Sequence, residues 1–437
     1  MFLPSKALYC IQKLEQAGFA AYVVGGCVRD SLLGLTPQDY DLCTAAKPET
    51  IAEIFREHTL VRSGEKHGTI GVVLDHHVYE ITTFRTEGEY GDSRHPDWVE
   101  FVENITLDLA RRDFTVNAMA YSPTRGLADP FDGREDLKNK TLRAVGHAQT
   151  RFSEDALRIL RGVRFAVRYD LTVEENTKSA MFCLAPLMEK LARERVFDEL
   201  CKLLPLVKAE DLRNFAPILT QVIPELQPCL GFDQKNSHHA YDVFTHIAHV
   251  VEATPADLGL RWAALLHDIG KPSCFTLDDA GKGHFLGHAA CSADMADAIL
   301  LRLKAPTALR SQVDLLIRQH MTRIESDPRA VRRAMSRLGS DMLRQLLLLQ
   351  EADMGSKGVG RPQEMAQFPI LRQLMAQIEA ENACLTIKDL AVNGHDLMAL
   401  GYHGPAIGQA LQFLLEQVLD ERVDNTKEAL MKALQDR

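Results

Sequence analysis

The stretch VVGGCVRDSLLGLTPQDYDL, residues 23–42, combines two adjacent glycines, an arginine and two aspartates that are one residue apart. The β-rich run AYVV at 21–24 leads into Gly25 and Gly26, and a helical pattern follows. Backbone N–H groups at the start of such a helix attract an anion. Arg29 in the first turn adds a charge-assisted phosphate contact. The stretch therefore predicts a strand–turn–helix unit that binds phosphate.

The two aspartates of this stretch, Asp39 and Asp41, flank Tyr40 in a segment expected to be a strand. The two-residue period of a strand places both carboxylates on one face, where they repel each other unless a cation lies between them. Carboxylate oxygens suit Mg²⁺, and two such ions can hold the attacking and leaving oxygens of a phosphoryl displacement. Glu80 is a candidate third ligand. Taken alone, the stretch also permits a plain turn followed by a loop.

Composition restricts the class of protein. The chain has 437 residues, of which 46% are hydrophobic and 25% charged, which is typical of two to four globular domains. Acidic residues outnumber basic ones by 60 to 50, so a nucleic-acid partner must be held by local patches. The nine cysteines form no CxxC pair, which disfavours a zinc knuckle or a disulfide framework. With no apolar run long enough for export or a membrane span, a cytoplasmic protein is expected.

The organisation changes along the chain. Short β-rich runs such as TIGVVL, VYEITTF and VEFV alternate with turns and helices up to about residue 146. From Phe152 onward, apolar residues recur at helical spacing. A mixed α/β domain followed by an all-helical part is therefore predicted, with joints near residue 210 and at 352–365.

Four ordered motifs resemble one known family, which comprises the class II tRNA nucleotidyltransferases (CCA-adding enzymes) and the bacterial poly(A) polymerases. GGCVRDSLLG ahead of the DYD pair resembles its signature, and RRDFTVNAMA at 111–120, DPFDGREDLKNKTLRAVG at 129–146 and EDALRILRGVRFA at 154–166 follow in the family order. The resemblance implies an α+β chain with a polymerase-β-like head. Its expected domains are the head at 1–146, a helical neck at 147–225, a body with an HD motif at 226–355 and a tRNA-binding tail at 356–437.

The resemblance also implies an activity and its site. The expected reaction is the template-independent addition of C, C and A to the 3′ end of tRNA from CTP and ATP, with Mg²⁺ as cofactor and release of pyrophosphate. Asp39, Asp41 and Glu80 would be catalytic. The expected nucleotide-binding residues are Gly25, Gly26, Arg29, Arg112, Asp113, Asp155, Arg158, Arg161 and Arg164.

The polar segment at 85–98, with Asp92 and Arg94, resembles the family's flexible loop for the switch from C to A addition. A surface connection between two strands is the alternative.

Asp155 and Arg158 also permit a physical argument about base choice. At positions i and i+3 they would be neighbours on one helix face. A carboxylate accepts from an exocyclic amino group, and a guanidinium donates to a ring nitrogen or carbonyl. Cytosine and adenine offer that donor–acceptor pair, whereas uracil and guanine offer the reverse. The alternatives are a surface salt bridge for this pair and a solvated helix face for Arg164 and Arg168.

A second set of motifs resembles the HD phosphohydrolase signature. DVFTHIAHVV, LLHDIGK and HFLGHA supply His246, His267 and Asp268 as its core, suited to a second divalent metal. His288 and His320 are candidate additional ligands, Asp314 is a candidate last carboxylate, and His249 is expected to be a core or surface residue. Whether this site is active, vestigial or structural stays open.

Other functions remain compatible with these motifs. A poly(A) polymerase shares the head, although the C-terminal NTKEALMKALQDR lacks a strongly basic extension. A partial enzyme that adds only CC or only A is a further alternative. Two alternatives belong to other classes of protein: an HD phosphohydrolase with a nucleotide-sensing head, and a non-catalytic RNA-binding protein. The oligomeric state cannot be inferred from the sequence.

Overall fold

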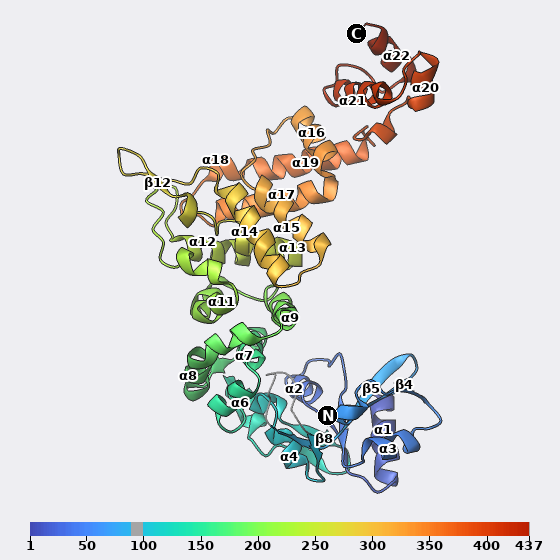
Figure 1. The fold of residues 1–437 in the computed structure, drawn as a ribbon, viewed down its shortest axis with the longest axis vertical. Coiled ribbons are helices and arrows are strands. Elements are labelled where there is room, and N and C mark those ends of the chain that lie inside the picture. Colours follow the sequence, from blue (N-terminus) through green and yellow to red (C-terminus); the bar gives the residue numbers. More distant parts are fainter. Residues whose placement is uncertain (89–98, 437) are drawn as a thin grey trace. The chain divides into compact units, whose positions relative to one another are not determined.

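The computed structural model describes residues 1–88 and 99–436. The chain forms two compact units, each described by itself below (Figure 1). The first unit contains residues 1–206 and 214–224, and the second contains 207–213 and 225–437. Asp92 and Arg94 lie outside the described residues, so their expected role stays a prediction.

The first unit is built on a seven-stranded sheet with the order β3-β4-β5-β2-β1-β8-β9. The interior strand β1 pairs antiparallel with β2 and with β8, and the central strand β2 pairs in parallel with β5. The strands are β1 (Ala21–Val24), β2 (Leu42–Thr44), β3 (Thr59–Val61), β4 (Thr69–Leu74), β5 (His77–Thr83), β8 (Ala120–Ser122) and β9 (Gly126–Ala128). β1 and β4 have the predicted bounds, and all four residues of β1 are buried.

The remaining elements of the head surround this sheet. They are α1 (Ser5–Gln16), α2 (Gly26–Leu32), α3 (Pro48–Ile54), α4 (Ile105–Ala110), α5 (Gly133–Lys138) and the strand pair β6 (Arg85–Glu87) and β7 (Val99–Phe101). α1 contacts β1 and β2 through a buried apolar stripe of Ala7, Cys10, Ile11 and Leu14. This three-and-four spacing is the reason a helix forms here. The sheet is therefore anchored at the strands that lead into the motif at 23–42.

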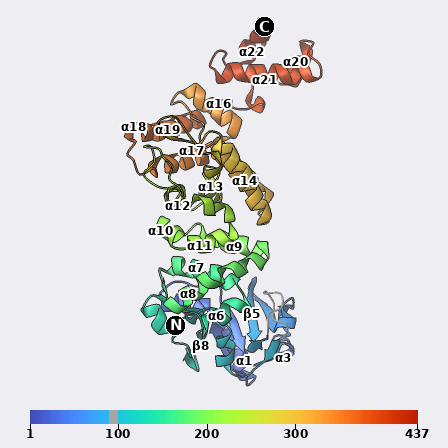
Figure 2. The same cartoon turned by 60° about the vertical axis from the view of Figure 1, so that its left-hand side comes forward.

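Helices follow the head, as predicted. The first unit continues with α6 (Ala148–Glu154), α7 (Leu157–Tyr169), α8 (Glu175–Leu184), α9 (Arg193–Leu203) and α11 (Ala216–Val222). α7 packs against α9, and α6 packs against α8 (Figure 2). The placement of Asp155 and Arg158 on one helix face assumed a single helix across 154–166. This prediction is wrong, because Asp155 has an extended backbone and separates α6 from α7.

The second unit is helical apart from the short strand pair β12 (Thr276–Leu277) and β13 (Gly283–His284). Its first helices pack around the buried α13. They are α12 (Val243–Ala253), α13 (Leu258–Leu266), α14 (His288–Arg302), α15 (Thr307–Gln319) and α17 (Ser340–Gly355). A second apolar core joins α16 (Pro328–Leu338) and α19 (Gln367–Ala380), and a third holds α20 (Gly394–Ala399), α21 (Pro405–Leu419) and α22 (Lys427–Gln435).

No helix within the described part of the chain is both long and apolar enough to cross a membrane. The nine cysteines are all free thiols. The division of the helical part into neck, body and tail at residues 147, 226 and 356 stays a prediction.

Candidate active sites

The predicted catalytic carboxylates meet at one cavity of the head. Asp39, Asp41 and Glu80 line a hollow of about 350 Å³, together with Gln38, Tyr40, His77, Val78 and Tyr79. Glu80 lies on β5, which pairs with β2. Asp39 and Asp41 precede β2, which begins at Leu42, so the expectation that both lie within a strand is wrong. Both side chains nevertheless line the same hollow.

Electrostatics at this cavity favour a cation. The pKa of Asp41 is raised, first by the protein atoms that partly enclose it and then by the negative charge of Glu80, with a smaller effect of Asp39. Arg112 acts in the opposite direction. A divalent cation between the carboxylates would remove this repulsion, and oxygen-only ligands are those that Mg²⁺ prefers. The residues present therefore fit the predicted metal.

The glycine turn lies beside Arg112, the residue whose positive charge lowers the pKa of Asp41. Gly25 has φ +77°, a conformation that only glycine adopts without strain, and a Cβ there would lie 3.0 Å from Arg112 Nη1. Arg112 also forms an ion pair with the buried Asp108 at 3.4 Å. Gly26 opens α2. The turn thus keeps backbone N–H groups and a guanidinium next to each other, as a phosphate site requires.

Arg29 lies in an internal network. Its buried guanidinium donates to Asn117 Oδ1 and to Tyr169 Oη, and it pairs with Asp30 at 2.7 Å. Its central carbon also lies 4.2 Å from the centre of the Tyr169 ring. This network joins α2 to α7, and the expected phosphate contact of Arg29 stays a prediction.

Asp113 and Arg161 form an ion pair of 2.8 Å. Burial would raise the pKa of Asp113, but the positive charge of Arg161 and the hydrogen bonds from Asn117 and Arg161 lower it to about 2. Arg161 also lies 3.8 Å from Glu199 on α9, and Glu199 accepts from the buried Arg164 at 2.6 Å. Arg164 is buried, so the alternative of a solvated helix face is wrong for this residue, whereas Arg168 is exposed as that alternative expects.

Asp155 is held at the junction of α6 and α7. Its Oδ1 accepts from the backbone N–H of Leu157 at 3.0 Å, which caps the start of α7. Its Oδ2 accepts from Arg195 Nη2 at 2.7 Å. An ionised carboxylate has about four acceptor positions. Acceptor capacity therefore remains for a further donor, such as an amino group of a base.

Arg158 does not form the surface salt bridge with Asp155 that was the alternative interpretation of this pair. Its Nη1 donates to Glu154 Oε2 at 2.6 Å and to the Arg151 carbonyl, and its Nη2 donates to the Arg111 carbonyl. Of the five N–H groups of an arginine, two are left without a partner among residues 1–88 and 99–436. These contacts fix a buried guanidinium that has donors to spare.

The sequence interpretation missed four residues of this region: Asn117, Tyr169, Arg195 and Glu199. Asn117 and Tyr169 lie inside or next to recognised motifs, so the motifs were the available signal. Arg195 and Glu199 come from LARERVFDEL at 191–200, whose alternating charges resemble any solvated helix. Only the packing of α9 against α7 shows that these charges are turned inward.

The HD residues converge in the second unit. His246 on α12, His267 and Asp268 directly after α13, and Asp353 on α17 are all buried. The Nε2 atoms of His246 and His267 lie 3.3 and 3.2 Å from Asp268 Oδ2. Asp353 Oδ1 lies 3.0 Å from His246 Nε2. The expectation that Asp314 supplies the last carboxylate is wrong, because Asp314 pairs with Arg318 at 2.7 Å, and the further carboxylate that lies beside His246 is that of Asp353.

The atoms at the centre of this cluster fit a bound metal. His246 Nε2 and His267 Nε2 are buried without a hydrogen-bond partner among the described residues, and Asp268 Oδ2, which forms an ion pair with Lys271 at 2.7 Å, lies within 3.3 Å of both. His267 Nδ1 lies 2.8 Å from the Ala264 carbonyl, which assigns its proton to Nδ1 and leaves Nε2 as a ligand. His249, in contrast, stacks on Tyr241 at 4.7 Å and lies outside both candidate ligand groups found among the described residues.

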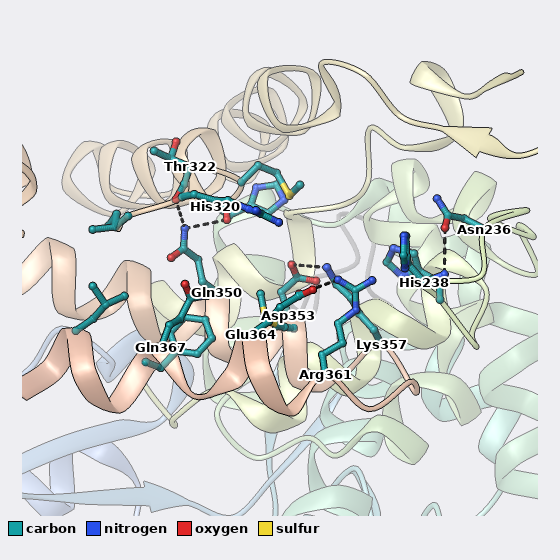
Figure 3. Close-up of a pocket in the computed structure, with 17 residues that line it drawn as sticks. Asn236, His238, His320, Thr322, Gln350, Asp353, Lys357, Arg361, Glu364 and Gln367 are labelled. Carbon is teal, nitrogen blue, oxygen red and sulfur yellow. Dashed lines mark hydrogen bonds and ion pairs between the residues drawn. The ribbon is translucent and has the colours of Figure 1, made fainter. Parts of the chain in front are cut away.

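A cavity of about 390 Å³ opens beside the cluster (Figure 3). Its wall includes Asp353 and His320, the cationic side chains of Arg323, Lys357 and Arg361, and an apolar side formed by Ile324, Phe368 and Leu371. Lys357 contacts Asp353 Oδ2 at 3.4 Å, and Arg361 pairs with Glu364 at 2.8 Å (Figure 3). The cavity can therefore accept an anionic molecule that also carries an apolar group.

The class of protein follows from the families that the chain matches. Three family models match the chain: the poly A polymerase head domain at 21–143, a probable RNA- and SrmB-binding site of polymerase A at 170–229, and the putative tRNA nucleotidyltransferase domain 2 at 286–434. The head and its aspartate cavity therefore define a nucleotidyltransferase.

Curated relatives identify the family within this class. The CCA-adding enzyme of Latilactobacillus sakei is 34% identical, over 98% of this chain and 97% of its own. That of Levilactobacillus brevis is 35% identical, over 98% and 96%. The crystal structure of the Bacillus stearothermophilus CCA-adding enzyme in complex with CTP has a TM-score of 0.71 at 29% identity, over 100% and 99%. The chain belongs to the family of CCA-adding enzymes.

Proposed function

We propose that this protein adds C, C and A to the 3′ end of tRNA, using CTP and ATP and releasing pyrophosphate. The observation that carries the proposal is the meeting of Asp39, Asp41 and Glu80 at one cavity beside the glycine turn, in a chain that belongs to this family. Similar structures of CCA-adding enzymes are complexes with CTP, with ATP and with tRNA. The free cysteines and the absence of a spanning helix among the described residues fit a cytoplasmic location.

The head residues divide the chemistry between them. The tRNA 3′-oxygen forms a new bond to the α-phosphorus of the nucleoside triphosphate, and the bond to the pyrophosphate oxygen breaks. Asp39, Asp41 and Glu80 would hold Mg²⁺, which supplies charge neutralisation at the reacting oxygens. Gly26 and Arg112 would bind the triphosphate through an N–H group and positive charge, and Gly25, whose own N–H donates to the Met119 carbonyl at 2.9 Å, would shape the turn. Positioning of the tRNA 3′ end next to the nucleoside triphosphate would supply most of the remaining rate increase.

Asp155 and Arg158 would select the base. Asp155 has acceptor capacity left after binding Leu157 N–H and Arg195, and Arg158 has donors left after binding Glu154 and two carbonyls. Cytosine and adenine satisfy both groups, whereas uracil presents a carbonyl to the carboxylate. A buried polar group left unpaired costs about 1–3 kcal/mol. The two residues can thus discriminate without a template.

One experiment separates this function from its enzymatic alternatives. A tRNA that ends before CCA is incubated with CTP, with ATP and with both, and its 3′ end is sequenced. Growth to CC with CTP alone and to CCA with both nucleotides is expected, and Asp41→Asn should abolish both. A run of A residues would indicate a poly(A) polymerase, and an end at CC would indicate a partial enzyme.

A second candidate function is favoured by the HD cluster. We propose that the second unit hydrolyses a phosphate ester with a divalent transition metal held by His246, His267, Asp268 and Asp353. Two imidazoles and two carboxylates suit such a metal, and the cationic side chains of the adjoining cavity suit a phosphate. Hydrolysis of p-nitrophenyl phosphate with Mn²⁺, and its loss in Asp353→Asn, would support this function. An equal rate in the variant would contradict it.

A further inference from the structure

Three sulfur atoms, none of which belongs to the HD cluster, meet at the first turns of α14. Cys291 Sγ donates to Met295 Sδ at 3.9 Å. Cys274 ends the short 3₁₀-helix η5 (Pro272–Cys274), and its thiol is in hydrogen-bonding contact with the thiol of Cys291. All three side chains belong to partly exposed residues, so an ion from solution can reach them.

The backbone of Gly270 holds the two cysteines next to each other. Its carbonyl accepts from the Cys274 N–H at 3.1 Å, and its N–H donates to Ser292 Oγ at 3.0 Å. A Cβ at Gly270 would lie 3.1 Å from Cys291 Cβ, so the two segments touch at this point. Met295 follows Cys291 by four residues and therefore lies on the same face of α14. Backbone contacts thus fix the positions from which the three sulfurs converge.

The sulfur contacts by themselves add little stability, because thiols and thioethers are weak hydrogen-bonding groups. The pKa of Cys274 is raised, first by burial and then by the hydrogen bond and charge of Cys291. The neutral thiol is therefore favoured as long as no cation is bound. A soft cation would reverse this preference, because the thiolate is the form that binds metal.

The spacing of the sulfurs fits an ion with three ligands. A metal–sulfur bond is about 2.3 Å long, so three sulfurs arranged as a triangle around one ion lie about 4 Å from one another. The 3.9 Å between Cys291 Sγ and Met295 Sδ agrees with this separation. The site therefore needs little rearrangement to take up an ion.

We propose that Cys274, Cys291 and Met295 bind a copper(I) ion. Thiolate and thioether ligands select a soft ion such as Cu⁺, whereas structural Zn²⁺ takes four ligands from cysteine and histidine. Binding releases the two thiol protons and changes no oxidation state, so the occupied site carries one net negative charge. The ion would join η5 to α14 and stabilise the second unit. This site depends neither on nucleotide addition nor on ester hydrolysis.

The test is an anaerobic titration of the reduced full-length chain with Cu⁺, supplied as its acetonitrile complex, in competition with the coloured chelator bicinchoninate. We expect wild type to withdraw one Cu⁺ per chain and to melt at a higher temperature when loaded. Cys274→Ser and Cys291→Ser should each lower the affinity by more than about 100-fold, because loss of an outer partner of a metal ligand alone costs up to that much. Met295→Leu should lower it by about 10-fold, because both thiolates remain.

Cys183→Ser is the matched control, because Cys183 is an exposed free thiol on α8 of the first unit, and it should keep the wild-type affinity. Failure of wild type to withdraw Cu⁺ would overturn the proposal, and this measurement does not depend on the folding of any variant. A loss confined to Cys291→Ser would reduce the site to a single thiol and overturn it as well. Circular dichroism of each variant checks its helix content.

Discussion

Replacing Asp155 by asparagine tests base selection most directly. The amide oxygen still caps α7 at Leu157 N–H, so the fold should be kept. The amide nitrogen, however, would face Arg195 and the amino group of cytosine, which places donors against donors. It would at the same time offer a donor to the carbonyl of uracil. The change therefore weakens the correct base and favours the incorrect one.

The expected magnitude follows from the contacts of this carboxylate. Asp155 is a charged and mostly buried acceptor, with 14% of its side chain exposed. Loss of a hydrogen bond to a charged group costs about 1.5–3 kcal/mol. The ratio of kcat/KM for CTP to that for UTP should fall by roughly 10- to 100-fold, because 1.4 kcal/mol corresponds to a factor of ten. Single-nucleotide addition to a tRNA that lacks CCA provides the assay.

Glu174→Gln is the matched control for this experiment. Glu174 caps α8 through the Thr177 N–H at 2.8 Å and lies 3.8 Å from Arg143, so it combines a helix cap and an arginine in the same unit. Its replacement should leave the CTP-to-UTP ratio unchanged. An unchanged ratio in Asp155→Asn as well would refute the proposed base contact and leave Asp155 with a capping role only.

Other predictions concern the metals, the neck and acid stability. Asp41→Asn should lower nucleotide addition at least roughly 100-fold, since metal stabilisation of the reacting charges is worth several kcal/mol; near-normal CMP incorporation would contradict the metal site. Arg195→Met should lower the CTP-to-UTP ratio less than Asp155→Asn does, because it removes only the partner that positions the carboxylate; an effect on kcat/KM for CTP and UTP alike would mean general damage. His246→Ala should abolish Mn²⁺-dependent phosphate ester hydrolysis and leave CCA addition measurable, because the two sites belong to different units. The pKa of Asp113 is about 2 in the folded protein, against an ordinary value of 3.8. The ionised carboxylate therefore stabilises the fold above pH 4, and this stabilisation is lost as the pH falls. In denaturant titrations, the difference in free energy of unfolding between wild type and Asp113→Asn should shrink by about 1 kcal/mol between pH 6 and pH 3.

The sequence by itself determined the features that depend on short spacing. The run AYVV, the glycine pair and the DYD pair predicted a strand, a turn and two carboxylates, and the histidine–aspartate dipeptide predicted the centre of the HD cluster. Each signal lies within one or two elements, where the periods of strand and helix fix which side chains are neighbours. The local prediction was wrong where an irregular backbone interrupts the period, at Asp155 and just before Leu42.

Only the tertiary structure decided which distant residues complete each site. Asp353 on α17 replaces Asp314 beside His246, and Arg195 on α9 meets Asp155, although nothing local distinguishes these charges from solvated ones. The physical reason is that charges that become buried and charges that stay in solvent have the same spacing along a helix. Their burial is decided only when another helix packs against them. Asp268 shows the same limit: its position next to His267 is a sequence property, but its contacts with His246 and His288 arise from the packing of α12 and α14 against α13.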